Sequence, residues 1–512
     1  MSEALNINPF GGGGNGGGSV TIANNVEKDN YNAVSSDAVY RYVNNRLEAF
    51  GRYWIEENST PVAAGYIGSA ERGRDFIKWL ELGRYLVTDD RVFKKLWAAN
   101  SQKYDNGGIM GGAAALDGTE GQCMWCWCKF YYGYWEEELN NQHYTFEVVS
   151  KNPTFEGHRL IPIPRGGVSW LSAGVWDATT GKLCSLISDD ANYRGGSGSA
   201  LSAGTYTSLD NTMKQLTMLG MPRTEKSTDQ FGAAARLRGT GWEANWFVAE
   251  AVVEILMRLY FGNRSIQTAY DATSDSVALH RGGLGSGVTG MTSSGWNSYN
   301  GYHPLIPNVF SVLDEENNDI GDFTGVKTYV VKDKDGNTVY SAPVPFFAGL
   351  MNPFGHLYKC VRGLIINIAE TGTSDVYITP SMAAAYDSTT VADKTLAGHM
   401  ARTGGDIKKL ILNKLAMVPA EVGGSGSTYY GDHLYTDPAT YHGLKVRLAA
   451  VTRTMVRLLG RLTRARTTRL RLRLRASPRL SAYLRRIQRW SDWPVGYRRP
   501  VAVGRIFFEI VL

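Results

Sequence analysis

The sequence lacks the features of a membrane protein, a secreted protein or a disulfide-rich scaffold. No run of 18 or more apolar residues is present, so we expect no membrane insertion. Residues 1–10 contain neither a basic segment nor an apolar core, so we expect no signal peptide. The five cysteines are too few for a disulfide scaffold and favour folding in a reducing compartment.

Charged residues are also scarce, at 20% of the chain against roughly 25% in average proteins. Glycine and aromatic residues are abundant instead, with 58 Gly, 28 Tyr and 13 Trp among 512 residues. Hydrophobic residues make up 43% of the chain, enough to bury a sizeable core. This composition predicts a loop-rich β or α+β protein rather than a helical bundle.

The positive charge is confined to the C-terminal end. Residues 445–512 contain 17 arginines and Lys445 but only two acidic residues, whereas residues 1–444 contain 36 basic and 46 acidic residues, a net charge of −10. Such asymmetry is typical of a nucleic-acid-binding tail. The alternating Arg–Leu run at 469–475, with Trp490 and Trp493, could contact phosphates and stack on bases.

The N-terminal region predicts a tether followed by a short helix. Residues 11–18 are almost entirely glycine, as in a flexible linker, and we expect residues 1–30 to be extended or disordered. A helix is predicted over Ser36–Phe50, with one apolar stripe formed by Val39, Tyr42, Val43 and Leu47. The stripe packs either against copies of itself, as in a homotrimer, or against the body of the same chain.

Further along the chain, apolar periodicity predicts helices over 70–87 and Trp242–Tyr260, the second largely buried and capped by Gly262. Residues 105–170 are rich in aromatic and β-branched residues and predict strands.

Cys123, Cys126 and Cys128, with His143 nearby, are ligand types that zinc accepts. No second cysteine pair follows at zinc-finger spacing, and Met124, Trp125 and Trp127 intervene as in a buried strand. We therefore interpret these cysteines as core residues and expect no metal site.

Other motifs also favour structural interpretations. The Gly285-x-Gly287-x-x-Gly290 string lacks the preceding strand and following helix of a dinucleotide site. Residues 333–337, which resemble part of a calcium loop, predict instead the turn of a hairpin between strands at 326–331 and 338–341. The Glu136–Glu138 carboxylates are typical of a solvated face. We expect no catalytic residue and no cofactor.

The candidate ligand-binding residues are Trp296, Tyr299 and Tyr302. They lie in a loop that is otherwise Gly, Asn and Ser, a composition typical of recognition loops. The alternative is a loop folded onto the core.

Three stretches together resemble phage tail-fibre and receptor-binding proteins. They are Asn32–Tyr40 (NAVSSDAVY), Leu116–Gln122 followed by Lys129–Tyr132 (LDGTEGQ and KFYY), and Gly239–Trp242 followed by Tyr260–Gln267 (GTGW and YFGNRSIQ). The third pair is similar to the motif that brackets the long helix in C-type-lectin-like variable proteins, although Tyr260 replaces the usual Glu. The resemblance implies an α+β, C-type-lectin-like (formylglycine-generating-enzyme-like) domain in the C-terminal half.

Proteins of this kind are targets of diversity-generating retroelements, and their C-terminus is usually rich in Asn, Gly, Ala and Ser. This chain has a similar lead-in at Gly443–Ala449 and then becomes Arg/Leu/Thr-rich. Moving the reading frame back by one base turns CGN and CTN codons into Ser, Pro, Thr or Ala codons, and Thr codons into NAC, which includes Asn. Val451–Val456 can then be read as Gly-Asn-Ala-Asn-Asn-Gly, so we infer that residues from about Ala450 are out of frame and pack poorly.

The expected organisation has five parts: 1–30, a flexible segment; 31–55, a helical attachment or oligomerisation segment; 56–205, a mixed β-rich region; 206–449, the lectin-like domain; and 450–512, the Arg-rich tail. The resemblance implies a non-enzymatic virion tail protein, assembled in the host cytoplasm, that binds a host cell-surface receptor (protein or glycan) and other virion tail proteins. The alternatives are a nucleic-acid-binding protein that uses the tail, and an enzyme on the related formylglycine-generating fold.

Overall fold

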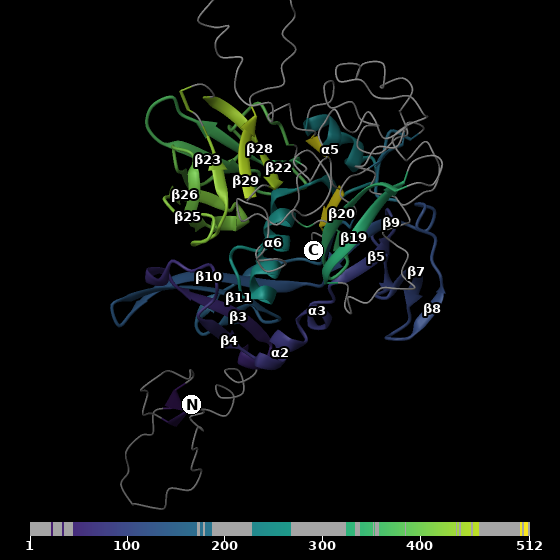
Figure 1. The fold of residues 1–512 in the computed structure, drawn as a ribbon, viewed down its shortest axis with the longest axis horizontal. Coiled ribbons are helices and arrows are strands. Elements are labelled where there is room, and N and C mark those ends of the chain that lie inside the picture. The colour runs from purple at the N-terminus through teal and green to yellow at the C-terminus, as the bar shows by residue number, and fades with distance from the viewer. Residues whose placement is uncertain are drawn as a thin grey trace, which may run out of the picture.

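The computed structural model describes residues 45–170, 175–177, 180–186, 228–267, 324–332, 338–351, 353, 358–451 (without 385, 437, 440 and 441) and 454–459, with short strands at 22–23, 33–34, 502–503 and 506–509. In this part of the chain strands predominate and helices are few, so the fold is strand-rich α+β, as the composition predicts. Three large sheets lie around one central helix, α6 (Phe247–Phe261) (Figure 1).

The first sheet has the strand order β14-β10-β11-β3-β4, formed by Ile161–Ile163, Phe130–Leu139, Gln142–Ser150, Ala49–Ile55 and Gly65–Gly68. Its centre is the β10–β11 hairpin, in which Leu139 pairs with Gln142. The two turn residues, Asn140 and Asn141, have φ angles of 53° and 60°. Asparagine tolerates this left-handed conformation, and two such residues in a row form the tight turn that suits the twist of a hairpin.

The second sheet has the order β18-β31-β15-β9-β5-β6-β7-β8, formed by Trp242–Ala244, Ile506–Glu509, Gly166–Ser169, Gln122–Trp127, Gly83–Val87, Phe93–Trp97, Asn100–Asp105 and Met110–Ala113. All six residues of β9 are buried. Their side chains alternate between two cores: Cys123, Trp125 and Trp127 enter the main core, whereas Met124 and Cys126 enter a smaller one. The aromatic Cys-rich segment is therefore a strand buried on both faces, as predicted.

The third sheet has the order β24-β23-β22-β28-β29-β27-β25-β26, formed by Thr395–Met400, Ser374–Ile378, Tyr358–Ile368, Gly443–Val451, Thr454–Leu459, His433–Tyr435, Gly405–Ile411 and Val418–Val422. A further strand, β30 (Ala502–Val503), pairs with β22. This sheet lies above the first one in the view of Figure 1.

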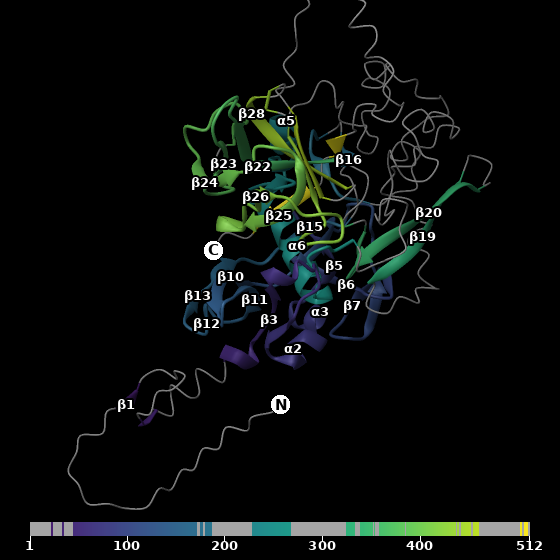
Figure 2. The same ribbon diagram turned by 60° about the vertical axis from the view of Figure 1, so that its left-hand side comes forward.

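Smaller sheets complete the described strands. They are β19–β20–β21 (Gly325–Lys332, Thr338–Phe347 and Leu350–Met351), β1–β2 (Ile22–Ala23 and Ala33–Val34), β12–β13 (Thr154–Phe155 and His158–Arg159) and β16–β17 (Val175–Trp176 and Leu183–Cys184). The antiparallel β19–β20 pair confirms the predicted hairpin, which projects from the body in Figure 2.

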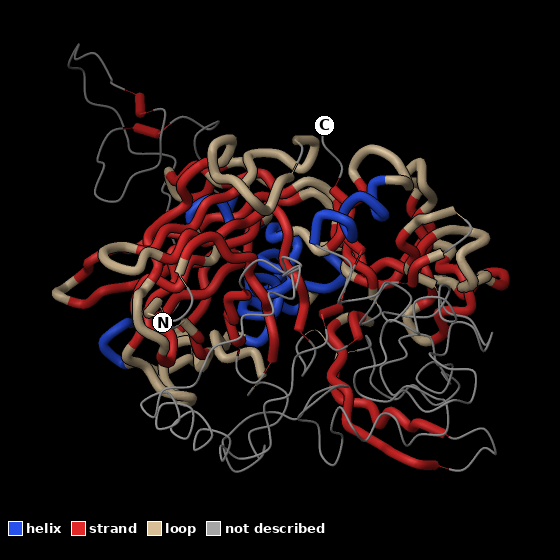
Figure 3. Tube along the Cα trace, turned by 90° about the horizontal axis from the view of Figure 1, so that it is seen from above, coloured by secondary structure: helices blue, strands red, loops and turns tan. Residues whose placement is uncertain are grey.

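The labelled helices of the described residues are α2 (Ala70–Arg74), α3 (Phe76–Trp79), α5 (Thr228–Arg236) and α6, with 3-10 turns η1 (Glu56–Asn58) and η6 (Asn413–Leu415). Residues 45–47, within the predicted N-terminal helix, are also helical. Helix α6 is buried around most of its circumference and lies centrally, with strands on both sides (Figure 3). It ends at Gly262, whose φ of 62° and N–H bond to the Arg258 carbonyl form the predicted C-cap. No described helix combines the length and apolar character needed to cross a bilayer.

Three helix predictions are wrong at their ends. Residues 83–87 form β5, not helix, because they pair with β6 and β9. Trp242–Ala244 form β18 and pair with β31. Ala49 and Phe50, predicted as the end of the N-terminal helix, begin β3 and pair with β11. In each case pairing with distant strands overrides a local helical periodicity.

Several predictions fall outside the described residues. They concern the glycine linker at 11–18, the predicted helix before residue 45 and the side chains of the Arg-rich tail. The poor packing expected of that tail stays a prediction. The structure adds that backbone from the tail region pairs with body strands, since β29 pairs with β27 and β31 pairs with β15 and β18.

Candidate ligand-binding cleft

A cleft of about 660 Å³ opens between the β10–β11 hairpin and the β25–β26 side of the third sheet. Its volume falls within the roughly 300–1,000 Å³ typical of ligand sites. The lining is rich in tyrosine and ionisable residues: Glu56, Glu57, Tyr134, Glu136, Glu137, Glu138, His143, Tyr144, Thr145, Arg264, Lys408, Lys409, Glu421, Tyr429 and Tyr430.

Arg264 anchors a buried part of the lining. Its side chain is 2% exposed, and its two Nη atoms donate to the carboxylate oxygens of Glu56 at 2.7 and 3.2 Å. The guanidinium lies over the rings of Trp54 and Tyr430, at 4.6 and 4.9 Å from their centroids. Burial alone would raise the pKa of Glu56, but the hydrogen bonds and charge of Arg264 outweigh it and hold that pKa below its usual value. Glu56 and Arg264 thus form an ion pair joined by two hydrogen bonds.

The tip of the hairpin carries an imidazole–carboxylate pair. His143 Nδ1 lies 2.7 Å from Glu57 Oε1, and the His143 backbone N–H donates to both Glu57 oxygens. Their mutual hydrogen bond lowers the pKa of Glu57 and raises the pKa of His143. Glu138 lies on the other side of the ring, 3.9 Å from Nε2.

The opposite wall is joined to the hairpin by Lys409 of β25, whose Nζ lies 2.9 Å from Glu136 Oε2. The Tyr134 hydroxyl donates to Glu136 Oε1 at 2.8 Å, and burial raises the pKa of Tyr134. Lys408 lies 3.9 Å from Glu421 of β26. Two strands distant in sequence thus present their charges to the same space.

Tyr429, which lines the cleft, is held in place by Ser59. The Tyr429 N–H donates to the Ser59 carbonyl at 2.7 Å, and the Ser59 hydroxyl donates to the Tyr429 hydroxyl at 2.9 Å. Both residues have positive φ, 55° and 53°. Non-glycine residues adopt this conformation at a cost, and such strain clusters at binding sites.

Each carboxylate that lines the cleft has a basic partner. The pairs are Glu56–Arg264, Glu57–His143, Glu136–Lys409, Glu137–His158, Glu138–His143 and Glu421–Lys408. The cleft therefore presents fixed donors and acceptors side by side, together with aromatic rings. This arrangement can bind a polar ligand by hydrogen bonds and ring contacts.

Trp296, Tyr299 and Tyr302 lie outside the described residues, as do Gly285–Gly290 and the 333–337 turn.

The cysteines, interpreted as core residues, and the histidine considered with them as a zinc ligand are separated. Cys123, Cys126 and Cys128 are buried, in agreement with the core interpretation, whereas His143 is exposed at the hairpin tip. Across the described residues, no group of three potential ligands could hold a metal ion.

The Glu136–Glu138 run is partly exposed, as a solvated face should be, but it also lines the cleft. Sequence reasoning missed this role because Lys409, the partner of Glu136, is far away in the chain. The local signal was the Tyr-Trp-Glu-Glu-Glu run at Tyr134–Glu138, next to a turn of two asparagines.

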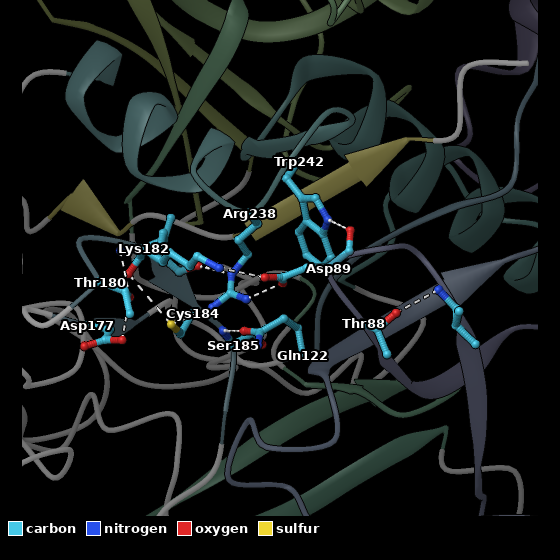
Figure 4. A network of polar contacts seen from close by, with 12 residues as sticks. Thr88, Asp89, Gln122, Asp177, Thr180, Lys182, Cys184, Ser185, Arg238 and Trp242 are labelled. Carbon is cyan, nitrogen blue, oxygen red and sulfur yellow. Dashed lines mark hydrogen bonds and ion pairs between the residues drawn. The ribbon is translucent and has the colours of Figure 1, made fainter.

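A second polar network lies beside β5, around Arg238 (Figure 4). Arg238, 6% exposed, donates to Asp89 Oδ1 at 2.6 Å and to the Cys184 sulfur at 2.7 Å. Lys182 pairs with the same carboxylate, and the Trp242 indole N–H donates to the Asp89 carbonyl. Burial raises the pKa of the Cys184 thiol, against the opposing charge of Arg238. These contacts hold the Gly239–Trp242 motif against the second sheet.

Comparisons with known proteins give no relative: no protein-family model, no curated protein and no solved structure matches the chain.

Proposed function

We propose that this chain is a non-enzymatic virion tail protein that attaches to host cell-surface ligands. Binding takes place through loops of a C-type-lectin-like domain within 206–449, with Trp296, Tyr299 and Tyr302 as ligand contacts. The N-terminal segment joins it to other tail proteins, as a homotrimer, and the C-terminus is the region that a retroelement diversifies. Neither cofactor nor metal takes part.

The observation that supports this proposal is the position of the Gly239–Trp242 and Tyr260–Gln267 motifs. The first includes Trp242 of β18, shortly before α6, and the second runs from the last turn of α6 through its C-cap. At one end Trp242 is buried and bonds the Asp89 carbonyl. At the other, Gly262 caps the helix and Arg264 pairs with Glu56. A rigid framework of this kind is what recognition loops require.

The test is adsorption of the fluorescently labelled full-length chain to a panel of bacterial strains. We expect saturable binding to some strains and at least a tenfold loss of affinity in a Trp296→Ala/Tyr299→Ala/Tyr302→Ala variant, because buried aromatic anchors dominate binding energies. The matched control is Tyr66→Ala, since Tyr66 is an exposed tyrosine of β4.

Unchanged adsorption in the triple variant would contradict the role of these loop residues. Binding of random-sequence duplex DNA that weakens steeply with salt, without adsorption to any strain, would contradict the proposal as a whole. That result would instead favour the Arg-rich tail as the functional element.

A further inference from the structure

The cleft between β10–β11 and β25–β26 has aromatic surface that a ligand can contact. Tyr134, Tyr144 and Tyr429 are each half-buried, so part of each ring remains accessible. The ring of Tyr144 is held by Tyr53 and Phe146, with centroids 6.2 and 6.1 Å away. Rings fixed by their neighbours offer contact area at little cost in conformational entropy.

The polar lining suits a ligand whose groups both donate and accept hydrogen bonds. Glu136 accepts from Tyr134 and from Lys409, so an acceptor and a cationic donor lie side by side. His143 and Glu57 form a second such combination at the hairpin tip. A hydroxyl group can donate to the carboxylate while it accepts from the neighbouring cation.

The same pairing disfavours a charged ligand. An organic cation would compete with Lys409 for Glu136, and an anion would compete with Glu57 for His143. The free energy needed to break either ion pair offsets part of the free energy that such a ligand would gain on binding. An uncharged, hydroxyl-rich ligand instead adds hydrogen bonds to pairs that stay intact.

The cleft is also preorganised. Glu56 and Arg264 are locked together in its buried part, and Ser59 and Tyr429 hold each other by two hydrogen bonds. A site that is ordered before binding loses less entropy when its ligand arrives.

We propose that this cleft binds an uncharged saccharide, with the tyrosine rings against the apolar faces of the sugar rings and the ion pairs on its hydroxyl groups. Its volume of about 660 Å³ fits a segment of two or three sugar units. Binding needs no metal ion. The inference concerns the cleft alone and does not rest on the proposed attachment through Trp296, Tyr299 and Tyr302.

The test is a printed array of neutral and acidic oligosaccharides from bacterial surface polysaccharides, probed with the full-length chain in EDTA. Calorimetry with the free neutral oligosaccharide then gives affinities. Tyr144→Ala removes a ring, and Glu136→Gln removes an acceptor charge. Each is expected to weaken binding about tenfold or more, because hydrogen bonds to charged groups and ring contacts are each worth that much. Tyr66→Ala, outside the cleft, is the matched control and should bind normally.

Thermal melting verifies that each variant folds. If Tyr144→Ala does not fold, the saccharide affinity of Glu136→Gln alone tests the proposal. Saccharide binding that neither variant weakens would overturn the placement in this cleft. Preference for an oligolysine peptide or for acidic sugars over neutral ones would overturn the ligand class. If the array shows no binding but the chain still adsorbs to cells, the cleft inference fails and the attachment proposal stands.

Discussion

At the scale of single residues, several buried charges in the described part of the chain are held in pairs, and Glu147 with Arg258 is the most buried of them. Their side chains are 0% and 1% exposed, and two nitrogens of Arg258 lie 3.1 and 3.2 Å from the Glu147 carboxylate. Tyr132 donates a further hydrogen bond to Glu147. The pair joins α6 to β11, so the helix is positioned by charge as well as by apolar contact.

Replacing Arg258 with Met should destabilise the protein strongly, because Glu147 is then left buried without its counter-ion. The expected loss is about 3–5 kcal/mol in the free energy of unfolding, measured by urea denaturation. The double variant Arg258→Met/Glu147→Leu should recover much of this loss, since neither charge remains. A double variant as unstable as the single one would show that the size of the Arg258 side chain, not its charge, is what matters.

Glu254 of α6 gives the fold a dependence on pH. Burial, together with the nearby negative charge of Asp432, raises the pKa of Glu254 to about 7 from an ordinary 4.5. The folded state therefore holds this proton more tightly than the unfolded state. Stability from this group is complete below the unfolded-state pKa and is lost as pH rises through the folded-state pKa of about 7.

Glu254→Gln mimics the protonated form and should flatten this dependence, with greater stability than wild type above neutral pH. Urea denaturation from about pH 5 to about pH 8 measures the effect. Glu71→Gln, which removes an exposed carboxylate of α2, is the control for loss of one negative charge. Parallel pH profiles for wild type and Glu254→Gln would contradict the assignment.

At the scale of elements, strand β22 depends on a glycine. Gly363 has a φ of 78°, and a Cβ there would lie 2.6 Å from the Trp246 ring. The register between β22 and β28 shifts between Val361 and Ile365, as at a β-bulge. The bulge lets the strand pass close to the start of α6.

Gly363→Ala should therefore cost several kcal/mol, the sum of backbone strain and overpacking against Trp246. Gly372→Ala is the matched control, because Gly372 has a similar φ of 82° but open space around its Cβ position. It should cost only about 1 kcal/mol. Equal losses of melting temperature in the two variants would show that contact with the Trp246 ring is unimportant.

Elements were predictable where the local pattern and the tertiary environment agree. Helix α6 is apolar on most of its surface and is followed by Gly262, so its core and its end could both be predicted. Residues 83–87 could not, because Tyr85 and Leu86 fit a helical stripe as well as a buried strand. These residues form a strand because they pair with β9. The sequence around them carries no sign of that pairing.

At the scale of the whole molecule, the cleft was beyond sequence prediction because its contacts span most of the chain. Ser59 and Tyr429 are 370 positions apart, and Glu136 and Lys409 are 273 apart. Each of these residues, taken alone, is an ordinary surface residue. Only the fold brings the two members of each pair together.

The second sheet also takes a strand from far along the chain, since β31 pairs with β15 and β18. A chain that stops at residue 505, and so lacks β31 alone, should melt at a lower temperature and aggregate more readily, because β15 and β18 each lose a partner strand. Removal of residues 510–512 alone is the control. Equal melting of both truncated forms and the full chain would show that β31 adds no stability, as expected of an out-of-frame tail.

Because the residues of the cleft come from distant parts of the chain, ligand binding is coupled to folding of the whole chain. The unfolded chain lacks the cleft, so a ligand binds the folded state alone. Such a ligand stabilises the folded state by mass action. A saccharide at one hundred times its Kd would add about 2.7 kcal/mol to the free energy of unfolding. The ligand-induced rise in melting temperature of the intact chain would then report the affinity. Any substitution between residues 56 and 430 that distorts the cleft would reduce this rise.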